Sequence, residues 1–180
     1  KKLQTVTLGC SKNKVDTEHI LSQVEDLYEI IPEGEDIPVD ILLINTCGFI
    51  GDAKEESIQA VLEGVDRKMR GEVGKVIVFG CLSQRYASDM PELIPEVDAW
   101  FGAREFDPVI RELGAEPSEE KRAERYLTTP SHYAYLKISE GCDRRCSYCA
   151  IPFIRGAHKS VPMEDLVEEA KRLADKGVRE

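Results

Sequence analysis

Short apolar segments along the first part of the chain predict a series of β-strands. Leu3 to Leu8 alternates between apolar and polar residues, whereas Ile41–Ile44 and Lys75–Phe79 are almost continuously apolar. Alternation is typical of a half-buried strand, and a continuous apolar run is typical of a parallel strand covered on both faces. Two further strands are predicted at Tyr28–Ile31 and Val97–Gly102.

Apolar residues at helical spacing follow these strands. Ile20, Val24 and Leu27 predict a helix with Asn13 or Asp16 as its N-cap. A second helix is predicted after Asp52–Glu55, which has the spacing of a capping box, with one apolar face at Ile58, Val61, Leu62, Val65 and Met69. Shorter helices are predicted at Ser83–Ser88 and Glu105–Leu113. Strands that alternate with helices predict an α/β domain with a small, doubly wound parallel sheet.

Three cysteines come directly after predicted strands. Cys10, Cys47 and Cys81 each stand in a loop that joins a strand to a helix. Ligands of a doubly wound sheet gather at the carboxyl ends of its strands, so we expect these three thiols to meet in space and to bind a metal group. The alternative is that they are ordinary buried cysteines, since free cysteine is among the most buried residue types.

The second half of the chain predicts a new domain that starts after a linker. Ala115–Thr129 is charged and lacks periodicity, whereas Tyr133–Ile138 alternates like a strand. Pro162 opens a predicted helix and Gly177 ends it, with Leu166, Val167, Ala170, Leu173 and Ala174 on one face. We therefore divide the chain into an N-terminal domain at 1–114, a linker at 115–132 and the start of a second domain at 133–180, of which only the first strand–helix unit is expected.

A second group of thiols lies between that predicted strand and helix. Cys142, Cys146 and Cys149 form a C-x-x-x-C-x-x-C run. Thiolates select iron–sulfur clusters, zinc or copper, and three thiolates on a cubane leave one iron open to a substrate or cosubstrate. Zinc is the alternative if His132 or His158 completes a tetrahedral site. A disulfide framework is disfavoured because the chain is neither short nor loop-rich.

Composition and charge limit the remaining choices. The 180 residues carry a formal net charge of −10, which argues against a general nucleic-acid or anionic-membrane surface. The start, Lys1–Thr5, lacks the apolar core of a signal peptide, and no apolar run is long enough to span a membrane. We expect a cytoplasmic protein without membrane contact. Around the second cysteine group, four cations can either bind anionic groups or face solvent: Arg144, Arg145, Arg155 and Lys159.

The second cysteine group, with Tyr148 before its last cysteine, resembles the signature of the radical S-adenosylmethionine superfamily. The resemblance implies a 4Fe-4S cluster on Cys142, Cys146 and Cys149, S-adenosylmethionine on its open iron, and a position near the adenine for Tyr148. It also implies that residues 133–180 begin an incomplete radical SAM (β/α) barrel. The hard chemistry then belongs to the cofactor.

The order of the two cysteine groups resembles the methylthiotransferase family. In that family the cysteines that correspond to Cys10, Cys47 and Cys81 bind a second 4Fe-4S cluster. The stretches Leu8–Asp16 and Cys149–Gly156 look like the branch that modifies a ribosomal protein. The resemblance implies a transferase that adds a methylthio group to the β-carbon of an aspartate in the twelfth small-subunit ribosomal protein, with the ribosomal protein or ribosome as partner.

The same resemblance implies how the work is divided. The cluster on Cys142, Cys146 and Cys149 would generate the radical that abstracts hydrogen, and the other cluster would present sulfur to the carbon radical. A low-potential electron donor is implied, and the 180 residues alone are expected to be inactive. Two alternatives remain: a transfer RNA methylthiotransferase that acts on an anticodon-loop adenosine, and a zinc-binding or electron-transfer module without radical chemistry.

Overall fold

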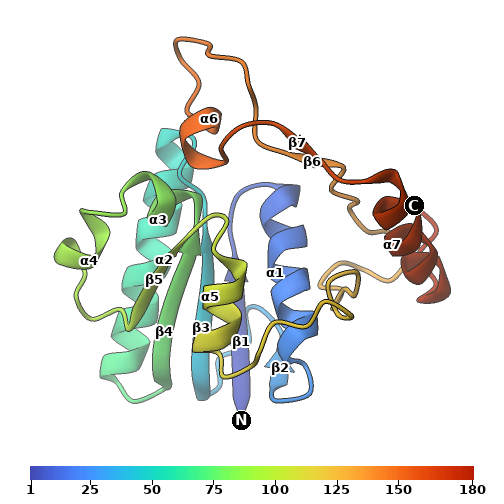
Figure 1. Ribbon diagram of the computed structural model, residues 1–180. Coiled ribbons are helices and arrows are strands. Elements are labelled where there is room, and N and C mark those ends of the chain that lie inside the picture. Colours follow the sequence, from blue (N-terminus) through green and yellow to red (C-terminus); the bar gives the residue numbers. More distant parts are fainter.

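Five parallel strands form one sheet in the N-terminal part of the molecule (Figure 1). The computed structural model describes residues 1–180. The strands are β1 (Lys2–Thr7), β2 (Glu29–Ile31), β3 (Val39–Thr46), β4 (Val73–Gly80) and β5 (Ala99–Gly102). Their order across the sheet is β2-β1-β3-β4-β5, and every neighbouring pair is parallel. All five strands predicted in this part of the chain are therefore confirmed.

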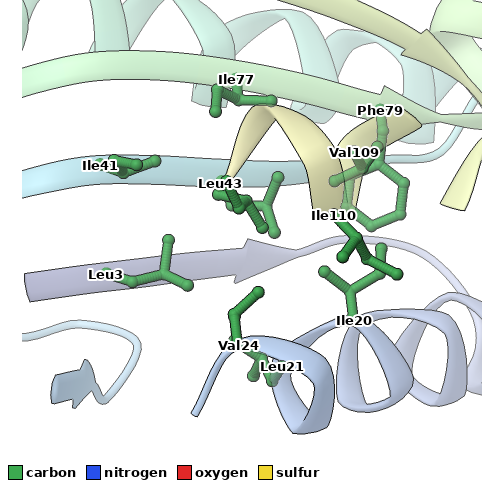
Figure 2. Close-up of a cluster of buried hydrophobic side chains, with 11 residues drawn as sticks. Leu3, Ile20, Leu21, Val24, Ile41, Leu43, Ile77, Phe79, Val109 and Ile110 are labelled. Carbon is green, nitrogen blue, oxygen red and sulfur yellow. The ribbon is translucent and has the colours of Figure 1, made fainter. Parts of the chain in front are cut away.

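Helices cover both faces of this sheet, as the doubly wound fold requires. α1 (Ser11–Val24) and α5 (Phe106–Glu112) share one apolar cluster with the sheet, in which Leu43 and Phe79 meet Ile20 and Val109 (Figure 2). α2 (Gly51–Met69) packs on the other face, where Val61 and Val65 meet Leu42, Ile44, Val76 and Val78. The short helices α3 (Cys81–Arg85) and α4 (Met90–Leu93) follow β4. The predicted α/β fold class is confirmed.

The predicted helix caps are wrong. α1 begins at Ser11 with Cys10 as its N-cap residue, and no side chain caps it. Asn13 and Asp16 lie inside the helix and are fully buried, because their side chains bind groups outside it. α2 begins at Gly51, so Asp52 is in the first turn rather than at the cap. α3 also begins earlier than predicted, at Cys81 itself.

The predicted linker contains no helix or strand, but it is packed against α1. Gln23 donates to the carbonyl oxygen of Ser118 at 3.1 Å and accepts from its amide at 2.8 Å. The amide of Tyr126 donates to the carbonyl oxygen of Glu18. The segment is therefore a fixed strap across the helix.

The strand predicted at Tyr133–Ile138 is not formed. Its alternating pattern remains, but its backbone groups bind other partners: the amide of Ala134 donates to the carbonyl oxygen of Glu180, and the carbonyl oxygen of Tyr135 accepts from Arg125. Only a two-residue strand, β6 (Ser139–Glu140), follows, and it pairs antiparallel with β7 (Lys159–Ser160). A strand pattern needs a neighbouring strand, and these residues have none.

Two helices follow the second cysteine group. α6 (Ile151–Ile154), which the sequence did not predict, lies above the carboxyl-terminal edge of the sheet (Figure 1). α7 (Met163–Asp175) begins after Pro162, and Gly177 follows it with φ of 92°, so both predicted ends of this helix are confirmed. No helix of the chain has the length and apolar character that crossing a membrane requires.

Candidate functional site

A cavity of about 760 Å³ lies where the strands end, and thiols from both parts of the chain line it. Cys10, Cys47 and Cys81 line it from three successive strand–helix loops, and Cys142 lines it from the second group. The topology thus brings together residues that are more than thirty positions apart, as the sequence predicted. Cys146 and Cys149 are not among the lining residues.

Close backbone packing positions the first three cysteines. Gly9 has φ of 90°, and a Cβ atom there would lie 2.8 Å from the Sγ of Cys47. A Cβ atom on Gly48 would lie 2.8 Å from the carbonyl oxygen of Cys81. At both positions a side chain would clash with the neighbouring loop, and at Gly9 the positive φ also favours glycine. The two glycines therefore allow the three loops to converge.

Ser57 of α2 fixes the backbone of Cys47. The amide of Cys47 donates to the Oγ of Ser57 at 2.9 Å, and this hydroxyl donates to the carbonyl oxygen of Cys47 at 3.0 Å. Cys47 and Cys81 are buried, whereas Cys10 is exposed. Burial raises the pKa of the Cys81 thiol, and the nearby positive charge of Arg155 opposes that rise.

The second cysteine group lies on a loop that is held at both ends. The amide of Cys142 donates to the carbonyl oxygen of Gly156 at 3.0 Å, and the amide of His158 donates to Asp143 at 2.9 Å. Cys146 is exposed, and the ring of Tyr148 is 89% exposed. The loop therefore presents the thiol of Cys146 and the side chain of Tyr148 to solvent, whereas Cys142 and Cys149 are half-buried.

The donors around the cavity are soft thiols, which bind zinc or the irons of an iron–sulfur cluster. No group of three or more His, Cys, Asp or Glu side chains lies close enough together to hold a single metal ion. The His158 ring contacts Ser160 rather than a cysteine, and the His132 ring meets that of Tyr133 edge to face. A tetrahedral zinc site needs four donors around one atom, whereas a cubane takes its thiolates on separate irons. Three soft thiols around a roomy cavity fit the second arrangement.

Buried charges join the second cysteine segment to α1. The guanidinium of Arg155 donates to Asp16 at 2.7 Å, to Glu140 at 3.1 Å and also to the Oδ1 of Asn13. Lys137 binds the same two carboxylates. Burial raises the pKa of Glu140, but the charges of Arg155 and Lys137 outweigh it and keep that pKa below its usual value.

A second buried ion pair lies further along α1. Glu18 is completely buried, and it accepts from Arg125 and from the amide and hydroxyl of Thr128 at 2.8 Å and 2.9 Å. Arg125 also donates to Glu169 of α7 at 2.7 Å. The strap between residues 115 and 132 is thereby fixed to two helices.

Sequence reasoning missed most of these charged residues. The sequence pattern predicts Asn13 or Asp16 as a cap and places Arg155 among four cations that either bind anionic groups or face solvent. The available signal was that Asn13, Asp16 and Thr17 stand at helical spacing, so they share one face, and that no apolar residue precedes Val15 in this helix. A polar stripe at the sheet's ligand-binding edge indicates buried contacts.

The fold and the two cysteine groups define an α/β protein with a thiol-lined site between a parallel sheet and a radical SAM-type loop. Residues 2–102 match the model described as "Uncharacterized protein family UPF0004", and residues 136–180 match that of the "Radical SAM superfamily". The chain belongs to the UPF0004 family.

Curated relatives agree with this assignment. The chain is 51% identical to a Cytophaga hutchinsonii protein named "Ribosomal protein uS12 methylthiotransferase RimO", over 99% of the chain and 41% of the relative. Proteins of the same name from Bacteroides thetaiotaomicron and Porphyromonas gingivalis are each 50% identical, over 100% and 99% of the chain and 42% of the relatives. The chain thus spans less than half the length of these relatives. The resemblance to the radical SAM methylthiotransferases is confirmed.

Proposed function

We propose that this chain is part of a radical SAM methylthiotransferase that modifies ribosomal protein uS12. The observation that carries the proposal is the single cavity in which Cys10, Cys47 and Cys81 meet Cys142. A methylthiotransferase needs a sulfur source beside its radical source, and this cavity joins the two cysteine groups. The names of the relatives support uS12 rather than a transfer RNA as the substrate.

The finer assignment follows the resemblance. Cys142, Cys146 and Cys149 hold one 4Fe-4S cluster, and Cys10, Cys47 and Cys81 hold a second. When bound, these clusters and S-adenosylmethionine supply radical hydrogen abstraction and the sulfur and methyl groups for transfer. The product carries a methylthio group on the β-carbon of an aspartate. In this scheme residues 1–114 form the domain that holds the sulfur-donating site, and residues 133–180 begin the radical SAM domain. Residues 115–132 link these two domains.

The residues of the chain have distinct tasks in this scheme. The glycines at positions 9 and 48 let the thiol loops converge, and Phe49, Ile50, Ile151 and Ile154 give the cavity an apolar wall. The exposed ring of Tyr148 is available to stack on the adenine. A low-potential electron donor is required to reduce the radical cluster.

Anaerobic reconstitution tests the proposed ligands. The chain, loaded with iron and sulfide, should contain two cubanes by Mössbauer spectroscopy. Cys47→Ala should lose one cubane, because only one group loses a ligand, and Cys146→Ala should lose the other. Loss of both clusters or of neither in Cys47→Ala contradicts the grouping, and one zinc per chain contradicts the proposal as a whole.

The substrate requires a separate experiment. A protein that carries this sequence at the full length of the relatives would be offered uS12 and transfer RNA in parallel under reducing conditions. A mass increase on an aspartate of uS12 is the expected result. Modification of the transfer RNA alone would favour the alternative substrate.

A further inference from the structure

Arg155 is a buried cation that crosses from the second cysteine segment into the first site. It follows α6 in the sequence, yet its guanidinium binds Asn13 and Asp16 of α1, which are 142 and 139 positions away. Only 6% of its side chain is exposed. A guanidinium keeps its charge at every relevant pH, so this positive charge is permanent.

Two cations, Lys12 and Arg155, line the cavity, and they differ in how far their charged groups are exposed to solvent. The side chain of Lys12 is 41% exposed and donates to the carbonyl oxygen of Ser139. Arg155 is enclosed among Asn13, Asp16 and Glu140. Solvent screens an exposed charge much more than a buried one. The charge of Arg155 is therefore the less screened of the two, and it acts directly on the thiol of Cys81.

Asn13 relays this charge to two of the proposed ligands. Its Oδ1 accepts from Arg155 and lies 3.9 Å from the Sγ of Cys10 and 3.8 Å from the Sγ of Cys81. The amide cannot turn, because its Nδ2 donates to the carbonyl oxygens of Leu8 and Thr46. Once the cysteines ionise to thiolates, their sulfur atoms can no longer donate a hydrogen bond to this Oδ1. The partly negative oxygen then repels the negative sulfur atoms unless a cation bound to the oxygen, here Arg155, offsets the repulsion.

We propose that Arg155 is a positioning residue that holds Asn13 against Cys10 and Cys81 and raises the reduction potential of the cluster at Cys10, Cys47 and Cys81. The inference rests on the proposed function, because it requires that cluster. Reduction adds a negative charge, and a buried cation stabilises the reduced state more than the oxidised state. The reduction potential of the cluster at Cys10, Cys47 and Cys81 would then depend on whether the segment that carries the second cysteine group is docked on α1.

The test isolates one cluster. In a background in which Cys142, Cys146 and Cys149 are all alanine, the reconstituted chain should hold only the first cluster, and a redox titration followed by EPR gives its midpoint potential. Arg155→Met should move that potential to a more negative value, because a positive charge is lost. Arg155→Lys should bring the potential most of the way back to that of the parent, since lysine keeps the positive charge although it lacks the planar guanidinium.

Arg104→Met is the matched control. Arg104 is exposed, forms no ion pair and lies against Gly156, next to Arg155. The same substitution there removes one charge and should leave the potential unchanged. A purely structural role for Arg155 predicts poorer cluster loading but no shift in the clusters that do form.

Each outcome is decisive. A loaded Arg155→Met variant with the potential of its parent contradicts the inference alone. If that variant does not load, Arg155→Lys is compared with Arg155→Gln: a more negative potential for glutamine supports the inference, and equal potentials overturn it. A background variant that takes up no iron contradicts the proposed function itself, and the inference falls with it.

Discussion

Two carboxylates on α1, Asp16 and Glu18, are almost completely buried, and each meets cations from far along the chain. Asp16 binds Lys137 and Arg155, and Glu18 binds Arg125. Burying a charge is costly unless it is paired and hydrogen-bonded, so such pairs add little stability beyond what apolar residues would give. We expect them instead to specify how residues after 115 dock on α1.

His19, beside this network, should make the stability of the chain depend on pH. Burial, together with the positive charges of Arg125 and Lys137, lowers its pKa from 6.5 to about 4. Between these two pKa values the unfolded chain binds a proton at His19 that the folded chain does not bind. The contribution of neutral His19 to the unfolding free energy is therefore complete above pH 6.5 and is lost as the pH falls towards 4. Between pH 7 and pH 5 the loss should be about 1–2 kcal/mol of unfolding free energy.

Urea denaturation of the chain and of His19→Gln at both pH values measures this effect. The variant should lose less stability between pH 7 and pH 5 than the parent does. An equal loss in both proteins would show that other groups are responsible for the acid sensitivity.

The cysteines were predictable from the sequence, whereas the charged partners were not. Six thiols among 180 residues are few, and each of the first three follows a predicted strand. Asp, Glu, Lys and Arg together make up 32% of the chain, so the special ones cannot be singled out by type. Glu18 and Arg125 are distinguished only by burial, which requires the three-dimensional structure.

At the scale of elements, α1 is buried around most of its circumference. Ile20, Leu21 and Val24 pack on the sheet, and Asn13 binds both the strand ends and Arg155. Asp16 and Glu18 lie on two further sides of the helix and bind cations of the later segments. A helix on the surface of a doubly wound sheet normally has one apolar stripe and one solvated face. Burial of polar residues on several sides explains why the apolar helical pattern in the sequence starts only at Val15 and is weak.

The central strand β3 should be sensitive to the loss of core volume. Leu43 is fully buried in the cluster shared by the sheet, α1 and α5 (Figure 2). Leu43→Ala removes buried methyl groups and leaves a cavity, so it should lower the unfolding free energy by about 2–5 kcal/mol. Chemical denaturation followed by circular dichroism checks this value.

Leu93→Ala is the matched control for that substitution. Leu93 belongs to α4 and is 69% exposed, so the same change should alter stability by less than about 0.5 kcal/mol. Similar losses for both variants would contradict the assignment of Leu43 to the core.

The central strands β3 and β4, which the sequence predicts as continuous apolar runs, are buried on both sides along most of their length. Continuous apolar runs such as Ile41–Ile44 leave few alternatives, because each residue needs an apolar neighbour. Tyr133–Ile138 has a strand pattern as well, but a strand forms only where its backbone groups find a partner strand. Here Arg125 and Glu180 bind those groups instead, and no local pattern reveals such distant partners.

At the scale of the whole molecule, Arg125 connects three parts of the chain. It lies in the strap and binds Glu18 of α1 and Glu169 of α7, while Lys176 donates to its carbonyl oxygen at 2.6 Å. Arg125→Met would leave Glu18 buried without its cation. We expect a loss of about 3–5 kcal/mol of unfolding free energy, measured by urea denaturation.

Arg122→Met tests whether burial causes this effect. Arg122 lies in the same strap, but its side chain is 57% exposed and pairs with Glu119 and Asp107 on the surface. Its loss should cost about 0–1 kcal/mol. If the two variants are equally stable, Arg125 does not act as the connection described.

The order of strands in the sheet also has a consequence for how the protein is made. β1 pairs first with β2, and then β3, β4 and β5 each add beside the strand that is already at the growing edge. N-terminal domains generally fold first during synthesis, at about 5–20 residues per second. No strand of this sheet has to be inserted between two earlier ones, so each can pair as soon as it leaves the ribosome, and Cys10, Cys47 and Cys81 can take their places in turn before Arg155 is made.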